Sequence, residues 1–519
     1  MAESRVKSSV RNVLAAWGGQ AAYAICAFVV RAIFVDTLAS EYVGLETLFT
    51  SLLTILSLAD LGVGSAITFA LYKPLAFDDR QQVKSLMRLF KRAYIVIGCV
   101  VIAAGACMTP FISGLLGNSA PDIPNLKLYF FCFVLNTGIS YFFSYKASLI
   151  TADQKNYVVS LIQYGFQIAM CGAQIAVLLV TGNYLLYLCC MIASTLLQNI
   201  VISHTANRLY PYLREKDIDP LDKGVLSSIK KNIVGLLMHR VAEVATTPTS
   251  NLIITAFVGL ATTSLYGNYQ LVTNALQRVV VKLFDSIIAS VGNLSAKESN
   301  ERQYEVFRTT FFINALIYGV VTGALLCAIN PFIWGIWLGR DWVLPDLTVI
   351  LLSLLFYFQG MRCAGQAFTS AYGLYWVTKW KAVLEAVSLP VLMLILVRPL
   401  GMNGVLLSGI ISTLCISTVY EGWAVYRRGF DAPLRNYVKM FALYSVLDVG
   451  AILLGFWICS FIALPGLIAF LVDAVIGMAL PVAVLWLCFH RTREYAETRS
   501  IIKRVAARLR HRSQPEEAA

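Results

Sequence analysis

Fourteen apolar runs, each long enough to cross a lipid bilayer as a helix, dominate this sequence. A spanning helix needs about 20 mostly apolar residues, and such runs begin near positions 12, 43, 93, 127, 157, 184, 232, 264, 307, 347, 382, 402, 438 and 466. Only 14% of the 519 residues are charged, against roughly 25% in an average soluble domain. Because backbone groups in lipid must be satisfied within their own segment, the runs predict helices. The expected fold class is an all-α polytopic membrane protein of about 14 transmembrane helices.

The distribution of basic residues predicts the orientation of these helices. With both termini in the cytoplasm, only three of the 42 Lys and Arg residues fall in expected outer loops, namely Lys127, Arg340 and Arg398, and six fall inside spans. The others lie in inner segments, as the positive-inside rule requires. Topology therefore explains the net charge of +13, and no nucleic-acid partner is expected. The expected location is the bacterial cytoplasmic membrane, with many passes and both termini inside.

Two stretches 223 residues apart are similar to each other. FVDTLASEYVGLETLFTSLL, from Phe34, aligns without gaps with FVGLATTSLYGNYQLVTNAL, from Phe257, and Gly44 matches Gly267. Six helices per repeat is an even number, so the repeats would share one orientation in the membrane. The expected organisation is an N-terminal six-helix bundle (1–207), a cytoplasmic linker (208–231), a C-terminal six-helix bundle (232–426), an accessory helix pair (438–489) and a basic cytoplasmic tail (490–519).

Charged residues concentrate in the first, second, seventh and eighth expected spans. They are Arg31, Glu46, Asp60, Arg240, Glu243, Arg278, Lys282 and Asp285. A charge held at a helix centre in the bilayer costs about 2.5 to 3.5 kcal/mol, so these groups must be paired, hydrated or neutralised. Their concentration in two matching hairpins favours a water-filled cavity. Ion pairs between helices that only fix the packing, for example Glu243 with Arg278, are the alternative.

The eighth expected span has its polar residues on one face. At steps of four and three, which place residues on one side of a helix, it carries Gln270, Asn274, Arg278, Lys282 and Asp285. The second span has a similar stripe from Glu46 through Asp60 to Gly64. We interpret the two stripes as related walls of a transport pathway. Among later spans, Arg362 also lies near mid-depth, whereas Glu385, Asp448 and Asp473 belong to no stripe and are expected to be buried, either protonated or paired, without a functional role.

No catalytic or metal site is expected. The twelve cysteines lie in apolar spans without a CxxC motif, as small buried hydrophobic residues do. No GxxxxGK[ST] motif is present, so ATP hydrolysis is not expected. Asp217 and Asp219 form a DxD motif, but no surrounding domain could make it a glycosyltransferase site. The protein is therefore expected not to be an enzyme and to need no cofactor.

Two stretches carry a resemblance to a known family. LETLFTSLLTILSLADLGVGSAITFALYKPLA, residues 45–76, resembles the second helix of polysaccharide exporters of the O-antigen flippase (Wzx) type. These belong to the multidrug/oligosaccharidyl-lipid/polysaccharide exporter (MOP) superfamily. NLIITAFVGLATTSLYGNYQLV, residues 251–272, resembles the turn between their helices seven and eight. Many relatives have an acidic residue where this chain has Ser250, so the resemblance does not carry an ion-coupling role to that position.

The resemblance implies a flippase that moves an undecaprenyl-diphosphate-linked oligosaccharide from the inner to the outer leaflet by alternating access. Partners would be this substrate, membrane lipid and the polysaccharide polymerase machinery. Cations in the spans would shield the diphosphate from hydrocarbon. The candidates for substrate binding are Arg278, Lys282, Arg240, Arg362 and Arg31. The candidates for charge pairing, or for coupling to a proton or a sodium ion, are Glu243, Asp60 and Asp285.

Three other functions stay open at this point. A lipid II flippase of the same superfamily also fits fourteen spans. A cation-coupled multidrug exporter would favour acidic and aromatic groups over cations, and the balance of four cations and four anions does not exclude it. An integral-membrane glycosyltransferase or polymerase would need a catalytic loop, and the external loops are all short.

Overall fold

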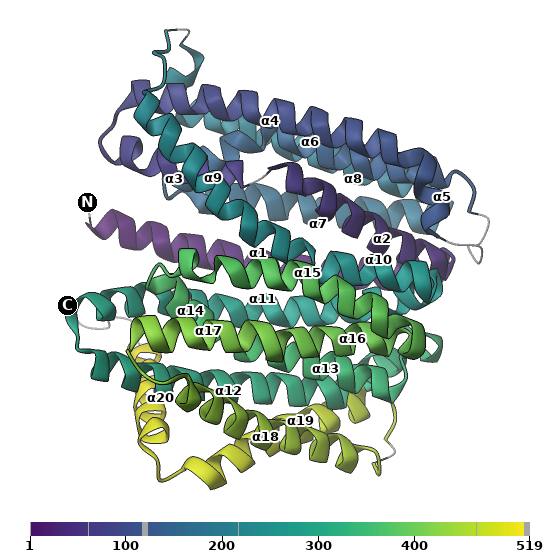
Figure 1. The fold of residues 1–519 in the computed structure, drawn as a ribbon. Coiled ribbons are helices and arrows are strands. Elements are labelled where there is room, and N and C mark those ends of the chain that lie inside the picture. Colours follow the sequence, from purple (N-terminus) through teal and green to yellow (C-terminus); the bar gives the residue numbers. More distant parts are fainter. Residues whose placement is uncertain (1, 61, 117–122, 216, 463, 513–519) are drawn as a thin grey trace, which may run out of the picture. The chain divides into compact units, whose positions relative to one another are not determined.

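The computed structural model of the protein describes residues 2–60, 62–116, 123–215, 217–462 and 464–512 (Figure 1). It is 89% helical, and the described residues form no strand. Twelve helical segments are long and apolar enough to cross a membrane. The expected fold class, an all-α polytopic membrane protein, is therefore confirmed. The seventh and eighth expected spans are helical but are not among the twelve segments found in the described part of the chain.

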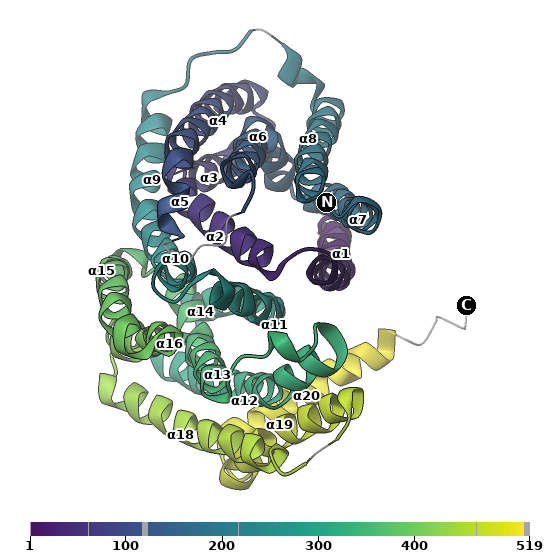
Figure 2. The same ribbon diagram turned by 90° about the vertical axis from the view of Figure 1, so that its right-hand side faces the viewer.

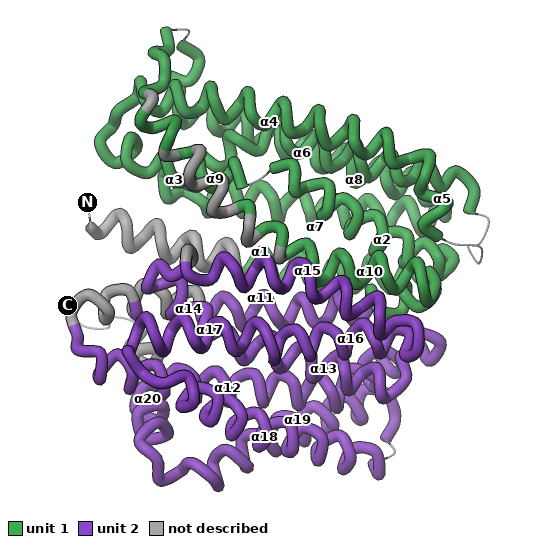
Figure 3. Tube along the Cα trace, in the orientation of Figure 1, with its two compact units in different colours: residues 1–267 green, residues 268–519 purple. Residues whose placement is uncertain are grey.

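The chain forms two compact units, residues 1–267 and 268–519, coloured separately in Figure 3. The division falls inside α11 (Leu260–Lys297), later in the chain than the linker that the sequence suggested. The reason is packing: α9 (Lys223–Val244) lies against α3 (Val63–Ala76), and α10 (Thr247–Phe257) lies against α2 (Ser40–Leu56). The seventh expected span therefore belongs to unit 1.

Unit 1 is an antiparallel bundle of long helices. Besides those just named it contains α1 (Ala2–Thr37), α4 (Arg80–Met108), α5 (Ile112–Leu115), α6 (Leu126–Ala152), α7 (Asn156–Thr181) and α8 (Tyr184–Leu209). Helix α6 packs between α4 and α8, and α7 packs between α8 and α1, as Figure 2 shows nearly end-on. Apolar faces of α3, α4, α6 and α8 form one buried core. Short 3₁₀ turns lie at Ser57–Asp60 (η1), Thr109–Phe111 (η2) and Pro211–Arg214 (η3).

Two glycines that the sequence repeat pairs with each other both lie where α2 crosses the start of α11. A Cβ on Gly44 would collide with Ser264, and a Cβ on Gly267 would collide with Thr47. Small residues let helix backbones approach closely in membranes. The Ser264 hydroxyl donates to the backbone oxygen of Ser40 at 2.8 Å, so this crossing is both close and hydrogen-bonded.

Unit 2 contains the rest of α11 and a second helical bundle. Its helices are α12 (Asn300–Phe332), α13 (Asp346–Met361), α14 (Cys363–Ala371), α15 (Tyr375–Leu400), α16 (Met402–Ser412), α17 (Val419–Ala424), α18 (Leu434–Cys459), α19 (Gly466–Phe489) and α20 (Arg493–Arg512). Between them lie π-helical turns at Ile333–Trp337 (η4), Thr413–Thr418 (η6) and Val425–Gly429 (η7), and a 3₁₀ turn at Arg340–Trp342 (η5).

Helix α12 is the central element of unit 2. It packs against α13, α18 and α19, and 67% of its most apolar window is buried, compared with 22% for α19. Gly323 and Gly477 bring α12 and α19 together, because a Cβ on either would collide with the backbone of the other. The expected accessory pair, α18 and α19, therefore packs directly on the buried helix of unit 2.

Candidate functional site

The polar stripe of α11 presents an exposed cation. Arg278 and Lys282 are both exposed, as is Asn274 one turn earlier, whereas Val280 and Phe284 on another side of the helix are buried. Arg278 forms no ion pair with the residues that the structure describes. A guanidinium in a membrane segment is costly in contact with lipid. This face of α11 is therefore suited to an aqueous space or an anionic ligand.

The other members of the stripe differ from Arg278. Lys282 takes part in an interaction of its own, and Gln270 is buried. The side chain of Asp285 lies outside the described residues. The sequence raised the question whether Glu243 neutralises Arg278. In the structure, the carboxylate of Glu243 contacts Arg240 of its own helix, at 2.9 Å between Nη1 and Oε2.

Asp60 lies at a break in the second span of unit 1. The 3₁₀ turn that it ends is separated from α3 by Gly62, which adopts a left-handed conformation with φ of 73°. The Gly64 backbone N–H and the Tyr94 hydroxyl lie near its carboxylate. The start of a helix favours a negative charge. Broken helices of this kind form ion sites in many transporters.

A cation from another helix faces this break. Arg240 of α9 lies close enough to Asp60 for their charges to attract each other, and α9 packs on both η1 and α3. The Arg240 and Glu243 side chains are 51% and 65% exposed. The structure thus brings together three of the sequence-predicted residues, Asp60, Arg240 and Glu243. Tyr94, which lies on α4, was not predicted, because no spacing in the sequence links it to Asp60.

Arg31 and Glu46 form an enclosed ion pair between α1 and α2. Arg31 Nη1 lies 3.1 Å from Glu46 Oε2, and the two side chains are 14% and 15% exposed. The Arg31 guanidinium also lies over the Phe34 ring, at 5.7 Å. The positive charge of Arg31 is therefore balanced inside unit 1.

Arg362 belongs to a closed network of two cations and two anions in unit 2. Its Nε and Nη2 donate to the two carboxylate oxygens of Glu421, at 3.0 and 2.8 Å. Lys381 lies 2.7 Å from Glu421 and 3.3 Å from Glu385, and Arg362 lies 3.7 Å from Glu385. All four side chains are at most 14% exposed. The network joins α15 and α17 to the junction between α13 and α14, where Arg362 lies.

The sequence did not predict this network as a whole. Glu385 was expected to be buried and either protonated or paired, and it is paired, because it contacts Lys381, Arg362 and the Ser417 hydroxyl. The four-residue spacing of Lys381 and Glu385 on one helix was the only sequence signal for the network. Asp448, for which the same expectation was made, has the Tyr357 hydroxyl as a partner, which donates to its Oδ2 at 2.8 Å.

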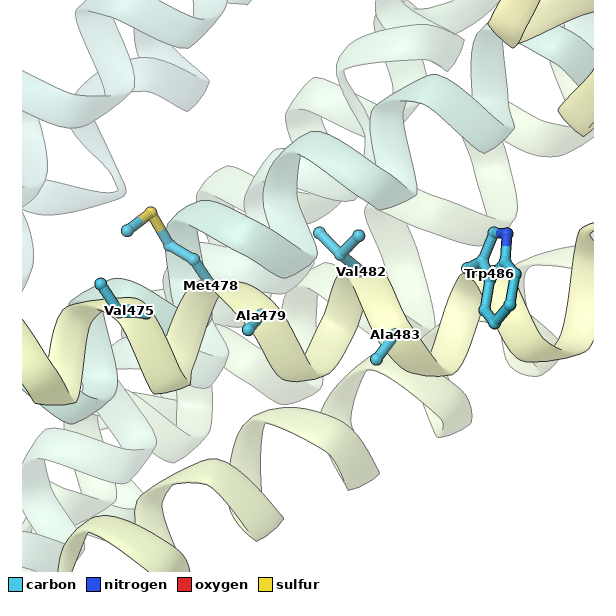
Figure 4. Close-up of a pocket in the computed structure, with 6 residues that line it drawn as sticks. All are labelled: Val475, Met478, Ala479, Val482, Ala483 and Trp486. Carbon is cyan, nitrogen blue, oxygen red and sulfur yellow. The ribbon is translucent and has the colours of Figure 1, made fainter.

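The outer surface of α19 has a different chemistry. A shallow hollow of about 450 Å³ is lined by Val475, Met478, Ala479, Val482, Ala483 and Trp486, as Figure 4 shows. None of these side chains carries a charge, so the hollow could not hold a phosphate. Such a surface is typical of a helix that faces acyl chains.

The fold is similar to that of solved MOP-type transporters. Over 93% of this chain and 99% of the other, it matches the lipid II flippase MurJ in an inward closed conformation, with a TM-score of 0.66 and 13% identity. An inward-facing multidrug resistance transporter of the MATE family of the MOP superfamily matches with a TM-score of 0.63 and 13% identity, over 81% of this chain and 96% of the other. A MOP superfamily transporter from Pyrococcus furiosus, whose binding pocket is described as having reverse polarity, matches with a TM-score of 0.51 and 12% identity. The match covers 83% of this chain and 97% of the other.

No protein-family model and no curated protein sequence matches the chain. At these identities the similarity establishes the fold alone. The substrate has to be argued from the residues of this chain.

Proposed function

We propose that this protein is a flippase that moves an undecaprenyl-diphosphate-linked oligosaccharide repeat unit from the inner to the outer leaflet by alternating access. Its product would serve surface polysaccharide biosynthesis, with the polymerase machinery as a downstream partner. The MOP-type fold supports transport as the general activity and gives no support to an enzymatic one. The chemistry of α11 supports the class of substrate.

The observation that carries the proposal is the exposed guanidinium of Arg278, without a carboxylate partner among the described residues. A diphosphate offers several oxygens in the geometry that a guanidinium binds with two hydrogen bonds. Lys282 is one helical turn away and also exposed. In this proposal the two side chains bind the diphosphate while the polyprenyl chain stays in the bilayer.

The remaining sequence-predicted residues take different roles. Asp60, with Tyr94 and Arg240 beside it, is the proposed site of a coupling proton or sodium ion, and Glu243 forms an ion pair with Arg240 from the same helix. Arg31 and Arg362 are each engaged by a carboxylate. We therefore assign these two to holding helices together rather than to the substrate.

Two other substrates are compatible with this fold. Lipid II, the substrate named for MurJ, is also a polyprenyl diphosphate, so Arg278 does not distinguish it from an oligosaccharide carrier. A cationic drug would be repelled by Arg278 and Lys282. The exposed cations thus favour both diphosphate substrates over a multidrug function, and a cellular test must separate the two.

The test is complementation of a deletion strain with Arg278→Gln and with Arg278→Gln/Lys282→Gln. A hydrogen bond to a charged group contributes about 1.5 to 3 kcal/mol, so the single change should reduce flipping about tenfold or more. Surface polysaccharide should fall, and the lipid-linked precursor should accumulate on the inner leaflet. Arg398→Gln, an exposed arginine on α15, is the matched control and should behave as wild type.

Peptidoglycan synthesis is measured in the same strains. If the double variant keeps wild-type surface polysaccharide and precursor levels, the substrate site is wrong. If peptidoglycan synthesis fails while surface polysaccharide is unaffected, lipid II is the substrate and the oligosaccharide proposal is wrong.

A further inference from the structure

One end of unit 1 contains a lysine, Lys146, whose hydrogen bonds in the described structure go to neutral groups. Lys146 lies near the C-terminal end of α6, half-buried. Its Nζ donates to Ser203 Oγ at 2.7 Å and to Asn207 Oδ1 at 3.0 Å, both on α8. Both acceptors are neutral, and within the described ranges no carboxylate forms an ion pair with Lys146. Among the described residues, its positive charge is therefore not balanced by a carboxylate.

The charged groups nearest to Lys146 are also cations. Lys91 of α4 and Arg214 of η3 lie close enough for their charges to act on the ammonium group. Both side chains are exposed. Like charges brought together repel one another, and the repulsion is largest where water is partly excluded. Three helical segments thus bring positive charge to one place without a counter-charge.

Two carboxylates at this end of unit 1, those of Asp153 and Glu215, are engaged by other groups. Asp153 lies 2.7 Å from Lys155 and accepts a hydrogen bond from the Tyr210 hydroxyl at 2.8 Å. Burial and this hydrogen bond raise the pKa of Tyr210, so its phenol stays neutral and adds no negative charge. Glu215 lies 2.9 Å from the buried Lys84. Neither carboxylate is available to Lys146.

The two acceptors of Lys146 have hydrogen-bond donors to spare. Since Ser203 Oγ and Asn207 Oδ1 accept from the lysine, the hydroxyl proton and the amide N–H groups remain for another acceptor. Cationic charge and unused donors converge here, which is the chemistry that binds a phosphate.

We propose that Lys146, with Lys91, Arg214, Ser203 and Asn207, binds the phosphate group of a membrane lipid. Lys146, Ser203 and Asn207 lie toward the C-terminal ends of the spanning helices α6 and α8, and basic clusters next to the ends of spanning helices bind anionic headgroups. The phosphate can come from an anionic phospholipid or from the diphosphate of the transported lipid. The second source rests on the proposed function, and the first does not.

The experiment measures the affinity of the purified full-length protein, in a neutral detergent, for two soluble probes. Dihexanoyl phosphatidylglycerol represents the phospholipid, and farnesyl diphosphate represents the carrier lipid. Lys146→Met keeps the aliphatic stem and should weaken binding of at least one probe about tenfold. Lys146→Arg should retain binding. Lys127→Met, at the opposite end of the same helix and exposed, should leave both affinities unchanged.

The outcomes separate the two sources and the two proposals. Loss of phosphatidylglycerol binding alone identifies a phospholipid site, and loss of farnesyl diphosphate binding identifies a substrate-loading site. Unchanged binding of both probes to Lys146→Met overturns the site, whatever Arg278 variants do to transport. If Lys146→Met does not fold, the double variant Lys91→Gln/Arg214→Gln, which changes two exposed residues, must weaken binding instead. Unchanged affinity of that variant for both probes would also overturn the site. A Lys146-dependent phospholipid site beside wild-type transport in the Arg278 variants would overturn only the proposed function.

Discussion

At the scale of single residues, the charges inside the spans separate by whether a protein carboxylate already holds them. Arg362 and Lys381 share Glu421 and Glu385 inside unit 2, and Arg31 pairs with Glu46. Arg278 and Lys146 have no such partner in the described part of the chain. An enclosed ion pair is strongly coupled because removal of one member leaves the other charge buried. Substitutions in the first group should therefore lower the stability of the protein, whereas substitutions of Arg278 and Lys146 should weaken ligand binding.

Glu421→Gln should destabilise the protein by about 3 to 5 kcal/mol, because Arg362 and Lys381 then share only one carboxylate in a buried site. The measurement is the thermal unfolding midpoint of the purified protein in detergent. Arg362→Leu/Glu421→Leu removes one charge of each sign and should recover part of the loss. Glu301→Gln, an exposed acidic residue at the start of α12, is the control. A midpoint for Glu421→Gln equal to that of the control would show that the network is not coupled.

At the scale of helices, the crossing of α2 with the start of α11 depends on two small residues. Gly44 and Gly267 leave room for Ser264 and Thr47, and the Asn251 amide of α10 donates to Ser51 Oγ of α2 at 2.9 Å. The internal repeat aligns these two glycines with each other. Each helix of the crossing therefore contributes the equivalent glycine of its own repeat. A larger side chain at either position would have to separate the helices.

Gly267→Leu should therefore lower stability by about 1 to 3 kcal/mol, the usual cost of overpacking, and should reduce transport. Gly165→Leu is the matched control, because a Cβ on Gly165 of α7 would meet open space. Replacing that helical glycine should have little effect or stabilise slightly. The thermal midpoints of both variants and their rescue of surface polysaccharide are compared. Equal midpoints for the two variants would mean that the crossing tolerates bulk.

The positions of the helices could be predicted from the sequence, whereas the partners of the buried charges could not. Apolar length is a local property, so the membrane-spanning fold follows directly from the runs. Arg362 and Glu421 lie 59 positions apart, and no periodicity relates them. Asp60 was found because it follows a stripe, but its partner Tyr94 lies on another helix. The exposure of Arg278 depends on which face of α11 its neighbours cover, and that is decided only by the packed structure.

At the scale of the whole molecule, two charged helical segments decide how many times the chain crosses the membrane. Among the described residues, twelve segments qualify as spans by hydropathy. The segment formed by α9 with α10, and α11, are not among these twelve, and they carry Arg240, Glu243, Arg278 and Lys282. If these two segments also cross the bilayer, there are fourteen spans, and the turn between α10 and α11 lies outside. If they do not cross, the turn lies on the same side as both termini.

Reporter fusions decide between these topologies. We expect alkaline phosphatase, inserted after Gly259 in the turn between α10 and α11, to be active, because that enzyme folds only outside the cytoplasm. Green fluorescent protein at the C-terminus should fluoresce, since the basic tail should remain inside. Phosphatase inserted after Arg340 should be active and after Lys155 inactive, which calibrates both sides. An inactive phosphatase after Gly259, with the two calibrating fusions as expected, would mean that the charged segments do not span. The cations of α11 would then not lie along a path across the membrane, and the proposed flipping mechanism would fail with them.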